Sequence, residues 1–183
     1  GLGNGLGLAG HNEDALTVKE AELATLRRLG GSERNMLVVQ SNLADTYAKL
    51  GRKEEALRLR RDVYSGYLKL LGEEDEDTLI AAINYVASLG ELERFGEAKS
   101  LLRKIMPVAP RVLGESHETT LRMRQSYAAA LYNDPGATLE DLREAVTTFE
   151  DIGRIARRVL GGTHPYFLGI ENSLRIARAA LRA

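Results

Sequence analysis

Residues 42–56 read NLADTYAKLGRKEEA, and this stretch decides the fold. One buried helix face is predicted by the three- and four-residue spacing of Leu43, Ala44 and Tyr47. The glycine that follows them is the residue that typically ends a helix. A second helical pattern begins directly after this glycine. The stretch therefore predicts two helices joined by a tight turn, over about residues 35–50 and 52–71.

The same pattern recurs along the chain. A Leu-Gly pair closes each unit, and successive pairs lie 42, 42 and 47 residues apart. The longer interval contains extra residues around 134–138, where Asp, Pro and Gly predict a loop between two helices. A fixed period of this length is typical of stacked helix pairs in a solenoid. The pairs are Leu29-Gly30, Leu71-Gly72, Leu113-Gly114 and Leu160-Gly161.

This period predicts an all-α chain that forms a single repeat domain over residues 1–183. No segment alternates with period two, so we expect no sheet. Residues 1–9 are rich in glycine and should fray. The expected divisions are a partial repeat at 1–32, repeats near 33–74, 75–116 and 117–163, and a C-terminal capping helix near 164–183.

Two prolines interrupt one of the predicted helices. Pro107 and Pro110 fall inside the segment 94–113, and an interior proline removes a helical hydrogen bond. We therefore expect a kink or an early end near Met106. The remaining helices are predicted near 76–92, 117–133, 139–160 and 166–182.

Composition limits the possible functions. The chain has 25 Lys and Arg against 26 Asp and Glu, so it lacks the basic excess of a nucleic-acid-binding protein. No apolar run approaches the roughly 18 residues of a membrane span, and no basic segment of a signal peptide begins the chain. We expect a cytoplasmic protein without membrane insertion. Because it does not begin with Met, we also expect a fragment or a processed form.

The repeated residues resemble the tetratricopeptide repeat, in the 42-residue form found in kinesin light chains. Residues 42–56 fit that family's N-L-A-x-x-Y-x-x-x-G-x-x-x-E-A pattern, and residues 160–165 (LGGTHP) fit its L-G-x-x-H-P pattern. At 113–118 the His is kept, but Glu118 stands in place of Pro. The resemblance implies a right-handed superhelical solenoid of antiparallel helix pairs, whose concave groove holds a peptide.

In such repeats the first helix of each pair lines the groove. Amide side chains there can donate to and accept from a peptide backbone, while cations and apolar residues select its side chains. The alternative is that these are solvated polar positions, with Arg122 paired to a neighbouring acid. The candidate groove residues are Val38, Asn42, Asp45, Lys49, Ile80, Asn84, Arg122, Gln125 and Asn172.

Other charged positions favour a structural interpretation. His117 and His164 occupy equivalent places before helices, as do Glu33 and Asp75, so we expect them to cap helices and not to bind a metal. The acidic run at 73–77 should favour the helix N-terminus that follows it; a docking site for a basic partner is the alternative. Arginine clusters at 58–61 and 154–158 should lie on the solvated convex side.

No pattern indicates an enzyme. The Gly-rich residues 5–10 match G-x-G-x-x-G, but the surrounding strands that a dinucleotide site requires are not predicted. An open groove also lacks the closed pocket that most chemistry needs. We therefore expect no catalytic residues and no cofactor, and a protein-interaction module or adaptor with a protein or peptide partner. The alternative is a structural scaffold subunit docked permanently through its convex face. Its open N-terminal end, where the half repeat should leave an apolar face uncovered, would be another docking surface.

Overall fold

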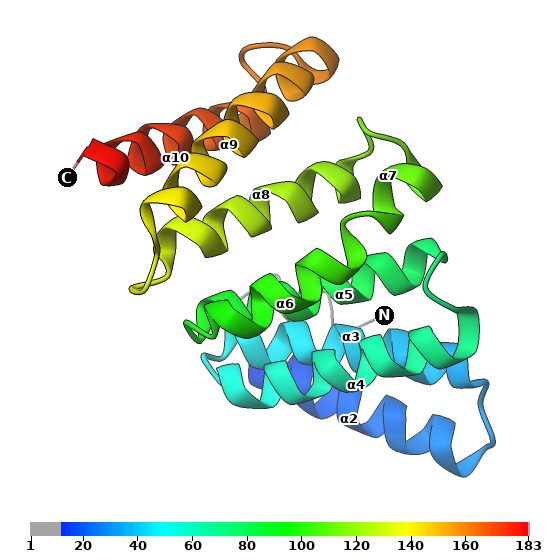
Figure 1. Ribbon diagram of the computed structural model, residues 1–183. Coiled ribbons are helices and arrows are strands. Elements are labelled where there is room, and N and C mark those ends of the chain that lie inside the picture. The colour runs from blue at the N-terminus through cyan, green and yellow to red at the C-terminus, as the bar shows by residue number, and fades with distance from the viewer. Residues whose placement is uncertain (1–11, 183) are drawn as a thin grey trace. The chain divides into compact units, whose positions relative to one another are not determined.

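The computed structural model describes residues 12–182, and every regular element over these residues is a helix (Figure 1). The predicted all-α fold is confirmed, and the predicted helix ends lie within two residues of those observed, except where the prolines intervene. Fraying of residues 1–9 falls outside the described residues. The helices are α2 (Asn12–Arg28), α3 (Glu33–Lys49), α4 (Lys53–Leu71), α5 (Glu76–Glu91), α6 (Phe95–Ile105), α7 (Val108–Leu113), α8 (Glu118–Asn133), α9 (Leu139–Leu160) and α10 (Pro165–Arg182).

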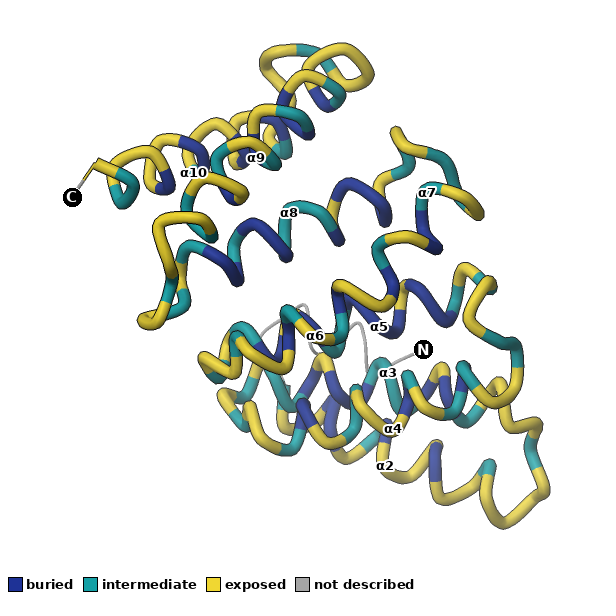
Figure 2. Tube along the Cα trace, in the orientation of Figure 1, coloured by how far each residue is buried: buried dark blue, intermediate teal, exposed yellow. Residues whose placement is uncertain are grey.

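The chain forms two compact units, residues 1–92 and residues 93–183. In the first unit α3 packs against both α2 and α4, and α4 packs against α5. In the second unit α8 packs against α6 and α9, and α9 packs against α10. Buried and exposed positions alternate every few residues along these helices, as Figure 2 shows for α8. Each unit therefore buries its apolar helix faces between successive antiparallel helices.

The Leu-Gly pairs mark helix ends for a conformational reason. Gly72, Gly114 and Gly161 cap α4, α7 and α9 with φ values of 87°, 98° and 88°. An L-amino acid rarely adopts this left-handed region, so glycine is favoured there. The recurrence of glycine at these places is thus a requirement of the turn.

The residue three positions after each of these glycines caps the next helix. The side chains of Asp75, His117 and His164 accept hydrogen bonds from backbone N–H groups of the first helical turn. The expected capping role of these three positions is confirmed. At the equivalent place before α3, however, Ser32 is the cap and Glu33 is the first helical residue, so the expectation for Glu33 is wrong.

The prolines divide their helix as expected. Met106 ends α6, and Pro107 precedes α7, where its missing N–H is not needed by the helix. The predicted loop after α8 is also present. Asp134 accepts hydrogen bonds there from Lys99 Nζ at 2.7 Å and from Gly136 N at 2.9 Å.

The half repeat buries one apolar face of α2 against α3. Leu16 and Leu23 of α2 are each 6% exposed and form a core cluster with Val39 and Leu43 of α3. Leu59 of α4 also packs against this cluster. The expectation of an uncovered apolar face at the N-terminal end concerns the side of α2 that faces away from α3, and it stays a prediction.

Candidate peptide-binding face on the first helices

The helices α3 and α5 each carry a row of exposed and half-buried residues spaced four, three and four positions apart. We call this row the exposed stripe. Such a spacing keeps all four residues on one helix face. On α3 the stripe is Val38, Asn42, Asp45 and Lys49, and on α5 it is Ile80, Asn84, Ala87 and Glu91.

The apolar members of the stripe face solvent. Val38 is 45% exposed and Ile80 is 37% exposed, although both are large hydrophobic residues. The two helices that present them lie next to each other in the first unit, since Arg34 Nη2 of α3 bonds Asp77 Oδ2 of α5 at 2.5 Å. Two neighbouring helices therefore offer one apolar contact each on the same unit.

The two asparagines leave their side chains open to a ligand. Their backbone carbonyls are occupied: Asn42 O accepts from Lys19 Nζ at 2.9 Å, and Asn84 O accepts from Arg60 Nη1 at 3.4 Å. Neither side-chain amide hydrogen-bonds another described residue, and both residues are half-buried. This arrangement fixes the backbone while it leaves both the donor and the acceptor of each amide free.

Arg60 lies elsewhere than the sequence indicated. Its guanidinium extends from α4 to Asp45 Oδ1 at 2.9 Å and to Ser88 Oγ at 2.7 Å, and only 12% of its side chain is exposed. The expectation that Arg60 lies on a solvated convex face is therefore wrong. Its neighbour Arg61 is exposed and pairs with Asp62, as a solvated position would.

Sequence reasoning missed Lys19 of α2. Its Nζ donates to Thr46 Oγ1 at 2.6 Å as well as to the carbonyl of Asn42, and the residue is only 6% exposed. Burial lowers the pKa of Lys19, and the nearby charge of Lys49 adds to this effect. The signal was present in the sequence, because position 19 lies on the same face of α2 as Leu16 and Leu23.

The predicted residues of the second unit divide between two faces. Arg122 of α8 is exposed and corresponds to Val38 and Ile80 in the exposed stripe. Gln125 and Asn172 lie on the adjacent face of α8 and α10, one position away from the register of Asn42 and Asn84. The side chain of Asn172 accepts from Arg175 Nη2 at 2.9 Å.

The first unit has a cavity of about 390 Å³ that opens beside the second helices of the pairs. Residues of α2 and α4, among them Arg27, Arg58 and Asp62, line it together with Leu43 and Tyr47 of α3. It does not include the exposed stripe. The first unit therefore offers two separate candidate surfaces.

A smaller cavity of about 220 Å³ lies in the second unit, where Leu121, Leu160, His164 and Tyr166 contribute to its lining. Burial raises the pKa of Tyr166 to about 12. Its hydroxyl oxygen is buried and has no hydrogen-bond partner among the described residues. The hydroxyl therefore adds a desolvated polar group without a compensating bond.

Comparison with known proteins supports the fold described above. The sequence pattern of the tetratricopeptide repeat matches residues 37–77, which cover most of α3, all of α4 and the start of α5. These residues form a tetratricopeptide repeat. This confirms the resemblance seen in the sequence, and repeats of this kind generally act as protein-interaction surfaces.

Solved structures show the same fold. Two crystal structures of a candidate kinesin light chain with nearly identical TPR-like repeats from Podosopora anserina have TM-scores of 0.82 and 0.80. Each is 23% identical and covers 98% of this chain, and the match covers 82% and 83% of those chains. BtubC (BKLC) from P. vanneervenii has a TM-score of 0.75 at 14% identity, over 99% of this chain and 74% of its own.

Among curated proteins, none matches the sequence. Within residues 12–182, no helix combines the length and the apolarity that crossing a membrane requires.

Proposed function

We propose that this chain is a protein-interaction module that binds a peptide segment of a partner along the exposed stripe of α3 and α5. The side-chain amides of Asn42 and Asn84 would bond the peptide backbone. Val38 and Ile80 would contact apolar side chains of the peptide. The peptide would be either extended or a short helix, because each of these conformations presents its backbone or side-chain groups in a row that can follow the stripe.

One observation carries this proposal. Asn42 and Asn84 are equivalent residues on neighbouring helices, each beside an exposed large hydrophobic residue, and neither amide is used within the described structure. An amide that donates and accepts together can pair with any peptide unit, so it gives affinity without sequence preference. Such a pair supports backbone recognition.

The stripe offers one cation and one carboxylate to a peptide. Asp45 is already paired with Arg60, whereas neither Lys49 nor Glu91 forms an ion pair with the described residues. Lys49 is proposed to bind an acidic side chain of the peptide. In the second unit, Arg122 is proposed to bind an acidic side chain in the same way, whereas Gln125 and Asn172 lie outside the register of the exposed stripe and take no part in this proposal. A guanidinium binds a carboxylate with two parallel hydrogen bonds, so Arg122 would select more strongly than Lys49.

A peptide library displayed on phage tests the proposal. Peptides selected on the full chain would be titrated against the chain and against an Asn42→Ala, Asn84→Ala double variant. Two lost hydrogen bonds cost about 1–3 kcal/mol together, so affinity should fall by roughly tenfold or more. Circular dichroism would confirm an unchanged helix content. Equal affinity of both proteins for every selected peptide would refute the proposal.

A scaffold subunit docked through its second helices is the other candidate. The cavity of about 390 Å³ beside α2 and α4 favours it, since it offers a concave contact outside the exposed stripe. An Arg58→Ala, Asp62→Ala double variant is the matched test. Loss of binding in this variant, with the asparagine variant unaffected, would place the interaction on the second helices.

A further inference from the structure

The last helix, α10, begins like the first helix of a repeat. It follows a Leu-Gly pair and the cap His164, as α8 follows Leu113-Gly114 and His117. The first helices α3 and α8 each pack against the second helix that comes after them. Within the described residues no helix follows α10. Counting from the Leu-Gly pair therefore identifies the residues of α10 that correspond to the contact residues of α3 and α8.

A second row of residues on α3 and α8 contacts the second helix that follows each of them. We call it the packing stripe. In α3 it begins at Leu37, which forms a core cluster with Val63 and Tyr67 of α4. In α8 it ends at Tyr132, whose ring lies 5.9 Å from that of Phe149 in α9. The stripe is Leu37, Ser41, Ala44 and Ala48 in α3; Leu79, Ile83, Val86 and Gly90 in α5; Leu121, Gln125, Ala128 and Tyr132 in α8; and Leu168, Asn172, Arg175 and Ala179 in α10.

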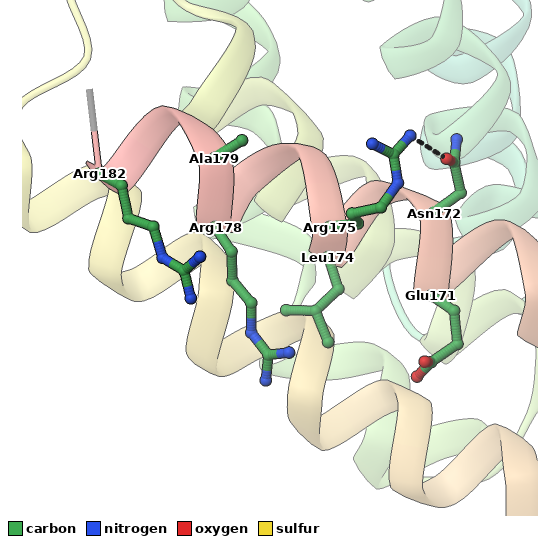
Figure 3. Close-up of a pocket in the computed structure, with 7 residues that line it drawn as sticks. All are labelled: Glu171, Asn172, Leu174, Arg175, Arg178, Ala179 and Arg182. Atoms are coloured by element: carbon green, nitrogen blue, oxygen red, sulfur yellow. Dashed lines mark hydrogen bonds between the residues drawn. The ribbon is translucent and has the colours of Figure 1, made fainter.

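Only in α10 are all four residues of this stripe exposed. All of its members in α3, α5 and α8 are buried or half-buried, whereas Leu168 is 53% exposed and the other three members in α10 are exposed too. Figure 3 shows Asn172, Arg175 and Ala179 projecting from one side of α10. A cavity of about 580 Å³ lies along the helix here. No helix among the described residues covers this surface.

Arg175 distinguishes this stripe from the others. The equivalent residues are Ala44, Val86 and Ala128, which are at most 3% exposed. The guanidinium of Arg175 bonds only the side chain of Asn172 among the described residues, so most of its donors are free. An apolar helix that covered it would bury an unpaired charge, which is strongly unfavourable.

We propose that the packing stripe of α10 is a docking surface for an amphipathic helix of a partner protein that carries a carboxylate opposite Arg175. A helix is the expected shape, because α4 and α9 fill the equivalent place on α3 and α8. Apolar or small side chains of the partner would cover Leu168 and Ala179. The same stripe of a second copy fits poorly, because it would bring another Arg175 to a surface that is already positive.

Two synthetic peptides based on α9 provide matched probes for this surface. Both contain residues 139–160 and keep the residues that α9 buries, among them Phe149 and Ile152. Changes at exposed positions alone give them opposite net charge. The acidic probe carries Arg154→Glu and Arg157→Glu, and the basic probe carries Glu144→Lys and Glu150→Lys. Binding of each labelled probe to the full chain would be measured by fluorescence anisotropy.

The acidic probe should bind at least tenfold more tightly than the basic probe, and Arg175→Glu should reverse this preference. Leu168→Asp should abolish binding of both probes. Leu139→Asp is the matched control for the apolar contact, since Leu139 is 54% exposed at the start of α9. Arg158→Glu, at an exposed position of α9, is the matched control for charge. Neither control should change affinity.

Three results would overturn the proposal. Equal affinity for the two probes would show that Arg175 does not select an acidic partner. Loss of binding in both controls would place the probes elsewhere. A dimer of the unliganded chain in sedimentation equilibrium that Leu168→Asp dissociates would identify a second copy as the occupant. The asparagine variant of the exposed stripe should bind the acidic probe normally, which separates this surface from the proposed peptide-binding face.

Discussion

Substitution of Gly66 by alanine tests how closely α4 approaches α3. A Cβ at position 66 would lie 3.1 Å from Cδ1 and 3.3 Å from Cγ of Leu37, with Cδ2 of the same residue closer still. Leu37 is 5% exposed and is held by Val63, Tyr67 and Ala81, so it has little room to turn away. Packing against Leu37 therefore favours glycine at position 66, although glycine inside a helix is otherwise unfavourable.

Two opposing contributions set the expected magnitude. Alanine in place of glycine inside a helix stabilises by about 1 kcal/mol. Overfilling a packed core costs about 1–3 kcal/mol. Gly66→Ala should therefore lower the free energy of unfolding by about 1 kcal/mol. Gly90→Ala in α5, where an added Cβ has no atom within 4 Å, should instead raise it by up to about 1 kcal/mol.

Urea denaturation followed by circular dichroism would measure both variants, and the difference between them should be about 2 kcal/mol. That difference corresponds to roughly 4–8 °C in melting temperature for a chain of this size. In a Leu37→Ala background, Gly66→Ala should become stabilising, because the obstructing side chain is gone. If Gly66→Ala and Gly90→Ala stabilised the wild-type chain equally, the close approach of α3 and α4 would be refuted.

Three further substitutions have defined outcomes. Tyr166→Phe removes a buried hydroxyl without a partner, so it should raise the free energy of unfolding by about 1 kcal/mol in thermal melts. It should also abolish the loss of stability between pH 10 and 12 that follows from the raised pKa of Tyr166. Lys19→Met removes a buried charge but also its hydrogen bonds to Thr46 and Asn42, so the free energy of unfolding at pH 7 should change by less than about 1 kcal/mol. Relative to the wild-type chain, the variant should lose stability as pH rises from the lowered pKa of Lys19 toward about 10.4, where the unfolded lysine loses its proton. The hydrogen bond from Lys99 lowers the pKa of Asp134. The ionised carboxylate of Asp134 therefore stabilises the fold above about pH 4, and this contribution is lost on further acidification. Asp134→Asn should reduce the acid sensitivity of the free energy of unfolding in urea titrations.

Periodicity was sufficient for the helices because the information is local. The Leu-Gly pairs located three helix ends through the conformation of their glycines, and Pro107 located the break between α6 and α7. Amphipathic spacing then assigned most buried faces. These features depend on residues within one or two helical turns, which a single sequence contains in full.

The positions of long charged side chains could not be predicted in the same way. Arg60 was assigned to a solvated face because it belongs to a cluster of arginines. Its long side chain instead extends from α4 to Asp45 of α3 and Ser88 of α5. Where such a side chain ends depends on which helix lies beside its own, and this is decided by packing. Lys19 differs, because its place on an apolar face of α2 already indicated burial, and only its partners required the structure.

The register between repeats carries information that no single helix contains. Taken alone, α10 is an amphipathic helix with arginines beside its apolar face, and the sequence assigned it as a cap on that basis. Comparison with α3 and α8 shows that Arg175 stands where the inner repeats bury alanine. Under the proposed docking, Arg175 excludes an uncharged helix, because such a helix would bury the guanidinium without a partner. Comparison of the repeats therefore locates a selective position that the sequence of α10 alone does not indicate.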